Sequence, residues 1–254
     1  MTRAIAEELA FNFRSHGHFG RTDRTRLTPA QTALVSRTAA RTPEVMVKVL
    51  SSGATSAKAV GRHIDYVSRK GEVELHADEG EVLHGRSVTD VLPEDWNLDL
   101  EEAGAAARIG KGTRHRPPRL VHKLVFSMPS GTSPKKVLGA VQNLCREEFA
   151  LKHRYVMALH TDEPHPHVHV ILKATSEKGE RLNIKKAHLK EWRVKFAAQL
   201  RELGVAANAT PRMFRGQEVG PKSTKAYWSE RRIAGESQRQ SARHRAERVL
   251  VRTR

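Results

Sequence analysis

Four histidines lie within the ten residues from His160 to His169, and the last two, His167 and His169, flank a single valine. Neutral imidazole is well suited to binding a divalent transition metal near neutral pH. The aliphatic run at 168–172 predicts a strand, in which side chains two positions apart share a face. His167 and His169 are therefore expected to point the same way.

The residues before this run predict a β-hairpin that brings a third imidazole to the same face. Residues 154–160 are also strand-like, and the turn-forming residues that follow them join the two strands. If His160 pairs with His167, one face of the hairpin is wholly apolar and the other carries His160, His167 and His169. Three imidazoles form an open metal site, with positions left for water or substrate.

Two neighbouring side chains belong to the same prediction. Asp162 is expected to orient a ligand imidazole from outside the metal's own ligand set. His165 is an alternative ligand, because strand alternation places it on the face of His167, although Pro166 and the turn can divert it. A histidine-rich loop that holds no metal is the plainer alternative.

A tyrosine in a basic helix surface could supply a nucleophile. The helix expected at about 57–70 buries a stripe of Val60, Ile64 and Val67, and Tyr66 is centred on the opposite side. Its phenol oxygen could attack a phosphodiester and form a covalent phosphotyrosine bond. A surface tyrosine stacked on a neighbouring arginine is the alternative. One turn before it lie Arg62 and His63, and one turn after it Arg69 and Lys70. Arg62, Arg69 or Lys70 could offset charge on a bound phosphate.

The charge of the chain favours a polyanionic partner. The 254 residues carry a formal net charge of +17, with a sequence pI of about 10.5. Such a field attracts nucleic acid first and anionic membranes second. Residues 71–102 depart from this trend, with eleven acidic residues and one basic residue. We expect this acidic stretch to be a solvated excursion from the domain, and the basic residues 222–254 to form an arm or an exposed helix.

The order of elements predicts an α+β fold with a mainly antiparallel sheet and helices stacked on one side. We expect a basic arm and helix at 1–42, one domain at 43–210 with an acidic insertion at about 71–108, and a basic, helical tail at 211–254. No apolar run reaches membrane-spanning length, and the single cysteine excludes an intramolecular disulfide. A cytoplasmic protein without membrane insertion is the expectation.

Three segments resemble one known family, the relaxases of the HUH endonuclease superfamily. His160-x-Asp-x-x-His-Pro-His-x-His is similar to their third motif, and His63-Ile-Asp-Tyr-Val-Ser-Arg-Lys-Gly71 to their first, with Tyr66 as the nucleophile. Phe126-Ser-Met-Pro-Ser-Gly-Thr132 resembles the second, in which Ser127 would contact DNA beside the cut. The resemblance covers roughly 44–205 and is strongest to the branch that includes the Agrobacterium T-DNA border relaxase.

This resemblance implies a palm-like HUH nuclease fold and a tyrosine single-strand DNA endonuclease and strand transferase. It would nick one strand at the transfer origin of a plasmid or integrative element and keep the 5′ phosphate on Tyr66 during conjugation. One divalent metal ion is expected, Mg²⁺ or Mn²⁺ in the cell, with Zn²⁺, Co²⁺ or Ni²⁺ as substitutes in vitro. The implied partners are single-stranded DNA, relaxosome accessory proteins and a type IV coupling protein, in a bacterial cytoplasm with export alongside the transferred strand.

Three other functions stay open on the sequence alone. A rolling-circle replication initiator of the same superfamily is one, although such proteins usually place the tyrosine after the histidine motif and Tyr66 precedes it. A non-catalytic DNA-binding regulator with a structural metal site is the second. The third is a metal-dependent hydrolase acting on a small molecule, which would leave the net charge of +17 unexplained.

Overall fold

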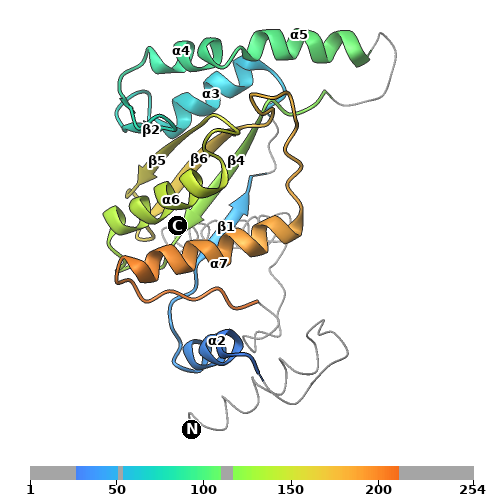
Figure 1. Ribbon diagram of the computed structural model, residues 1–254. Coiled ribbons are helices and arrows are strands. Elements are labelled where there is room, and N and C mark those ends of the chain that lie inside the picture. The colour runs from blue at the N-terminus through green and yellow to red at the C-terminus, as the bar shows by residue number, and fades with distance from the viewer. Residues whose placement is uncertain (1–26, 51–53, 110–116, 212–254) are drawn as a thin grey trace, which may run out of the picture. The chain divides into compact units, whose positions relative to one another are not determined.

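The computed structural model describes residues 27–50, 54–109 and 117–211 (Figure 1). The expected basic arm before residue 27 and the basic tail after residue 211 lie outside these ranges, so the domain bounds stay a prediction. None of the helices in the described ranges is both long enough and apolar enough to cross a membrane. The elements run in the order α2 Pro29–Ala39, β1 Met46–Val49, α3 Ala57–Val67, β2 Leu75–Ala77, β3 Val82–Leu83, α4 Val88–Asp95, α5 Leu98–Ile109, β4 Val121–Ser127, α6 Pro134–Glu148, β5 Tyr155–His160, β6 His167–Lys173 and α7 Lys186–Glu202.

The strands form one six-stranded sheet in the order β1-β4-β6-β5-β2-β3. Every neighbouring pair in it is antiparallel. Its centre is formed by β4, β6 and β5, the three longest strands, and all seven residues of β4 are buried. The predicted α+β class with a mainly antiparallel sheet is confirmed.

Helices cover both faces of this sheet, so the expectation of helices on one side is wrong. One face packs on α6 and α7, where Phe126 meets Phe196 edge-on with ring centroids 5.4 Å apart. The other face packs on α3, α4 and α5, where Ile64 and Ile171 are fully buried. Figure 1 shows α6 and α7 in front of the strands and α3, α4 and α5 gathered at the top. Strands that are apolar on both sides need two helical layers to exclude water.

The acidic stretch is part of this second layer rather than a solvated excursion. Strand β2 extends the main sheet by pairing with β5, and Leu75 is fully buried. Leu92, Trp96 and Leu98 of the same stretch are buried in the core formed with α3. On α4 and α5 the exposed carboxylates are Asp90, Glu94, Asp95 and Asp99, whereas Glu101 pairs with Lys173 and Glu102 accepts from the Ala57 N–H. Counting charges alone misassigned the segment, because its apolar residues recur at helical spacing between the acids.

Helix α3 ends at Val67, three residues earlier than expected. Arg69, Lys70 and Gly71 follow with φ of 52°, 59° and 87°, all in the left-handed region. A Cβ placed on Gly71 would lie 2.4 Å from the carbonyl carbon of Gly85, so the backbone of the next loop passes directly over this turn. Only glycine fits there, for reasons of both conformation and space.

Substituting this glycine should cost far more stability than substituting another glycine of the same conformation. Gly80 has φ +89°, but a Cβ on it would meet nothing within 4 Å. Gly80→Ala is expected to lose roughly 1–2 kcal/mol from backbone strain alone. Gly71→Ala should lose about 2 kcal/mol more, because the methyl group displaces Gly85. Urea unfolding of both variants measures the difference, and equal losses would show that the loop at Gly85 yields freely.

Candidate metal and nucleophile site

The predicted register of the histidine hairpin is confirmed. His160 pairs with His167, Leu159 with Val168 and Met157 with Val170. The face that carries Met157, Val168 and Val170 joins the apolar core under α6 and α7. The three histidines lie on the opposite face, at the end of the sheet nearest the end of α3.

The three imidazoles form one compact cluster. Each of His160, His167 and His169 offers a ring nitrogen, and these nitrogens all lie within 4.8 Å of one another. The ring centroids are 4.7–5.2 Å apart. His160 and His169 are buried, while His167 is half-buried at the rim. Water can therefore reach the cluster from one side only, which is the arrangement of an open metal site.

Backbone carbonyls hold two of the rings in a ligand orientation. His160 Nε2 donates to the carbonyl oxygen of Val67 at 2.7 Å, and His167 Nδ1 donates to that of His165 at 3.0 Å. A carbonyl can only accept, so each of these nitrogens carries the hydrogen and the other nitrogen of the neutral ring keeps its lone pair. Such outer hydrogen bonds are typical of metal-binding histidines. The donor set therefore fits a divalent metal ion.

Burial keeps the third ring neutral as well. The pKa of His169 is lowered to about 3 by burial first, and then by the nearby His160, His167, His63 and Arg69. Its Nδ1 atom is buried and has no hydrogen-bond partner within the described residues. A neutral imidazole is the form that binds a metal, because protonation removes the lone pair.

The structure separates His165 and Asp162 from the cluster. The imidazole of His165 is exposed and accepts a hydrogen bond from the Ser130 backbone N–H at 3.1 Å, so it is turned away from the other three rings. Asp162 was expected to orient an imidazole, but its carboxylate forms an ion pair with Arg69 instead. The orienting acceptors are the carbonyls of Val67 and His165, which side-chain types alone could not reveal.

Tyr66 lies at the rim of the histidine cluster. Its side chain is 54% exposed, and its ring meets that of His169 edge-on with centroids 6.1 Å apart. The guanidinium carbon of Arg69 is 5.3 Å from the centre of the tyrosine ring. Ser127 is buried and pairs with His167 across the β4–β6 ladder, so it lies beside the cluster on the other side.

The rest of the expected basic surface is divided among different environments. His63 stacks on Tyr66 with ring centroids 6.0 Å apart, but burial and the charge of Lys123 lower its pKa to about 4. It is therefore neutral at physiological pH rather than cationic. Arg62 lines a separate hollow between α3 and α4, together with Asp65 and Asp90. Lys70 is exposed in the turn after α3, so Arg69 is the cation of this set that contacts Tyr66.

Lys123 is a part of the site that sequence reasoning missed. It is buried on β4, with 7% of its surface exposed, and burial lowers its pKa. The signal was present in the strand alternation, since Lys123 and Ser127 are four residues apart and share a face. That face is also the face of the histidines, because Val125, between them, pairs with His169.

An antiparallel sheet that presents a His-x-His pair to a helix bearing an exposed tyrosine defines a nuclease domain of the HUH type. Residues 76–205 match the model of the relaxase family described as MobA/VirD2-like, nuclease domain. This segment contains the three histidines and makes up about half of the chain. The chain therefore belongs to the MobA/VirD2-like relaxases.

Curated relatives agree with this family. The chain is 26% identical over 213 residues to the T-DNA border endonuclease VirD2 of Agrobacterium fabrum, a match that spans 78% of this chain and 45% of that protein. The protein of the same name from Rhizobium rhizogenes is 26% identical over 140 residues, or 51% of this chain and 30% of the relative. Each match thus spans less than half of the relative's length.

Removing single histidines should separate ligands from bystanders. His160→Ala, His167→Ala and His169→Ala are each expected to weaken Mn²⁺ binding by about 100-fold or more, since even outer groups are worth 10–100-fold. His165→Ala should bind Mn²⁺ within about twofold of wild type and serves as the matched control. Isothermal titration calorimetry measures the Mn²⁺ affinity of the three variants and of the control. An unchanged Mn²⁺ affinity in His169→Ala would contradict a metal site at this cluster.

Removing the His63 imidazole should make the metal-free protein less sensitive to acid. Because burial lowers the folded pKa from 6.5 to about 4, the unfolded chain binds the proton first as pH falls through that window, and stability is lost there. In His63→Gln the loss of unfolding free energy between about pH 7 and pH 5 should be smaller by about 1 kcal/mol, a figure reduced for partial exposure. Urea titrations of wild type and His63→Gln with chelator, at steps between pH 7 and pH 5, measure the difference, and parallel losses in the two proteins would contradict it.

Proposed function

We propose that the chain nicks single-stranded DNA by transesterification, with Tyr66 as the nucleophile. The observation that carries the proposal is the exposed phenol ring, 6.1 Å from the His169 ring of a three-imidazole cluster and 5.3 Å from a guanidinium group. The matched family segment begins ten residues after Tyr66, so the role of this residue rests on the geometry and on the motif around it.

In the proposed reaction the Tyr66 oxygen attacks the scissile phosphorus. A phenol O–P bond forms as the P–O3′ bond breaks, the phenolic proton passes to solvent and the leaving 3′ oxygen gains a proton. The DNA then carries a free 3′ hydroxyl, and its 5′ phosphate is esterified to tyrosine. One phosphodiester replaces another, so attack by a 3′ hydroxyl reverses the step and reseals the strand.

The residues of the site divide this work. His160, His167 and His169 would hold a divalent metal, Mg²⁺ or Mn²⁺, which when bound polarises the non-bridging phosphate oxygens. Arg69, fixed by Asp162, offsets negative charge beside the phenol oxygen. Ser127 and Lys70 flank the cluster and the end of α3, where they would contact the strand on either side of the cut. Phosphoryl transfer depends chiefly on such positioning and charge neutralisation.

We further propose that the substrate is the transfer origin of a plasmid or integrative element. The names of the curated relatives, which are border endonucleases, support a site-specific nick. Conjugative transfer would then require relaxosome accessory proteins and a type IV coupling protein. The nicking would take place in the bacterial cytoplasm, with export of the protein on the transferred strand.

A non-catalytic DNA-binding regulator is the second candidate, because three imidazoles can also hold a structural metal. It predicts metal-independent binding to origin DNA without a covalent product. A rolling-circle initiator predicts the same covalent chemistry at a replication origin instead. The regulator therefore differs from the proposal in forming no covalent product. The rolling-circle initiator differs in the DNA that it cuts.

Tyr66→Phe should abolish the covalent product while leaving the fold intact. Oligonucleotides tiled across the element's own origin region, incubated with Mn²⁺, are expected to give a denaturation-resistant adduct with wild type at one tile, resolved by gel shift. Tyr155→Phe is the matched control, because Tyr155 is buried on the opposite face and burial raises its pKa to about 12. An adduct that survives in Tyr66→Phe would assign the nucleophile elsewhere.

A further inference from the structure

A basic groove lies at the opposite end of the sheet from the histidine cluster. It has a volume of about 690 Å³ and is bordered by the last residue of β1, Val49, and by His122 near the start of β4. Five residues of β4 separate His122 from Ser127, which corresponds to about 17 Å along the strand. Among the residues that the structure describes, no carboxylate lines this groove. The cationic residues that line it are Arg119, Arg181, Lys185 and Lys186.

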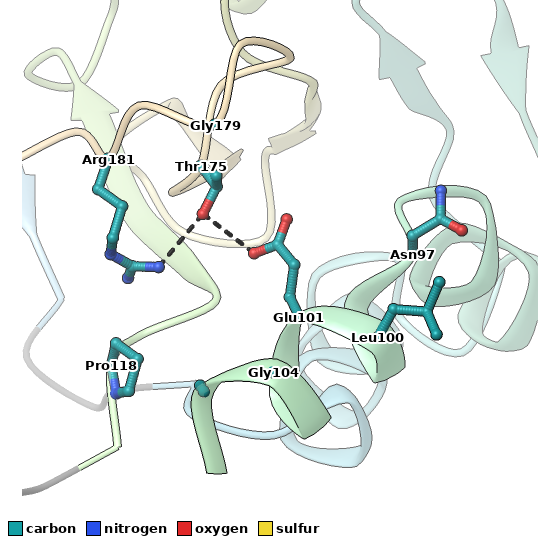
Figure 2. Close-up of a pocket in the computed structure, with 9 residues that line it drawn as sticks. Asn97, Leu100, Glu101, Gly104, Pro118, Thr175, Gly179 and Arg181 are labelled. Carbon is teal, nitrogen blue, oxygen red and sulfur yellow. Dashed lines mark hydrogen bonds between the residues drawn. The ribbon is translucent and has the colours of Figure 1, made fainter. Parts of the chain in front are cut away.

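Arg181 is held in place by uncharged acceptors. Its Nη2 donates to the backbone carbonyl of Arg119 at 2.6 Å, and its Nη1 donates to Thr175 Oγ1 at 3.2 Å. Thr175 in turn donates to Glu101 at 3.0 Å, as Figure 2 shows. Glu101 lines a separate cavity on the other side of Arg181 and pairs with Lys173 at 3.3 Å. The guanidinium is thus fixed at the groove, and no carboxylate in the described part of the chain bonds to it.

The start of helix α7 also favours an anion in the groove. Helix α7 begins at Lys186 with no acidic residue in its first turn, so the positive end of a 17-residue helix lies at the groove. His122, which is 9% exposed, forms part of the wall. Its Nε2 donates to the Leu182 carbonyl at 2.9 Å, so the neutral ring offers no donor to an anion and serves only as a reporter of binding beside it.

We infer that this groove binds the phosphodiester backbone of the DNA that flanks the cut. The identity of the anion as DNA rests on the proposed function, whereas the basic lining does not. Edge strand β1 connects the two places: Lys48 is exposed and pairs with Val125, which pairs with His169, so Lys48 lies on the histidine face. The groove itself lies on the face under α7, because Val49 and His122 pair with Leu124 and Leu172 of that core. A strand that leaves the site toward β1 would therefore pass Lys48 at the edge and bend around β1 to reach the groove.

The test compares two variants that lose the same number of charges. The groove variant is Arg119→Ala/Lys185→Ala/Lys186→Ala, and the control is Lys135→Ala/Lys136→Ala/Lys152→Ala, whose lysines do not line the groove. Binding of a fluorescent thirty-nucleotide oligo-dT is measured by anisotropy against salt concentration, in EDTA so that no cleavage contributes. Circular dichroism melting confirms that both variants fold.

The groove variant is expected to bind this strand about tenfold or more weakly than the control near 0.1 M salt. Its slope of log affinity against log salt should fall by about 2, because each single-strand phosphate contact contributes about 0.7. In wild type, the His122 ring resonances should move when the strand is added, which places it at the groove. Equal affinities and slopes for the two variants, or His122 resonances that do not move, would overturn the inference.

This outcome is distinguishable from failure of the proposed function. If no origin tile gives an adduct but the groove variant still loses oligo-dT binding, the nicking proposal fails and the groove remains a nucleic-acid site. If adducts form normally while the groove variant matches the control, the nicking proposal stands and the groove is not used by DNA.

Discussion

One hydrogen bond couples the tyrosine helix to the histidine cluster. His160 Nε2 donates to the Val67 carbonyl at 2.7 Å, across 93 positions of sequence. It fixes the ring orientation of His160, and it fixes the end of α3, and therefore Tyr66, against β5. Both partners are buried, so breaking this bond would leave a polar group unsatisfied in the core, at a cost of about 1–3 kcal/mol. The distance between the candidate nucleophile and the candidate metal ligands is set by this contact.

The sheet allows this coupling because its central strands change character along their length. Val121, Val156 and Ile171 on the α3 face are apolar and pack beneath Ile64. Further along the same face, the strands present His169 and Ser127, which are buried, and His167, which is half-buried at the rim. Burial of the apolar part holds the helix in place, and the polar part reaches the surface at His167. The opposite face is apolar where it is covered by α6 and α7 and carries His122 near the start of β4.

The histidine hairpin could be predicted from sequence because a slip of one residue would turn both its apolar side chains and its histidines to the wrong faces. The same reasoning could not place the acidic stretch, since Leu92, Trp96 and Leu98 become informative only once α3 offers a surface for them. Nor could it show that His63 is neutral, because that depends on burial beside Lys123 of a distant strand. The backbone acceptors at Val67 and His165 carry no sequence signal at all. The sequence therefore predicted the faces of single elements and of a hairpin between neighbouring strands. It did not predict the packing between elements that are distant in sequence.

The strained turn after α3 explains why the Val67 carbonyl is free to orient His160. In a continuing helix this carbonyl would accept from the N–H of Gly71. Instead, Lys70 N–H bonds to Asp65 O at 2.8 Å and Arg69 N–H to Tyr66 O at 3.3 Å, the pattern of a Schellman cap. Gly71 N–H bonds to Ser68 O at 3.0 Å, so no helical N–H reaches Val67. Arginine occupies the left-handed position where glycine is usual, at a cost of roughly 1–2 kcal/mol. Glycine there would relieve the strain but would remove the guanidinium that contacts Tyr66 and Asp162, so the turn sacrifices stability to place a charge at the site.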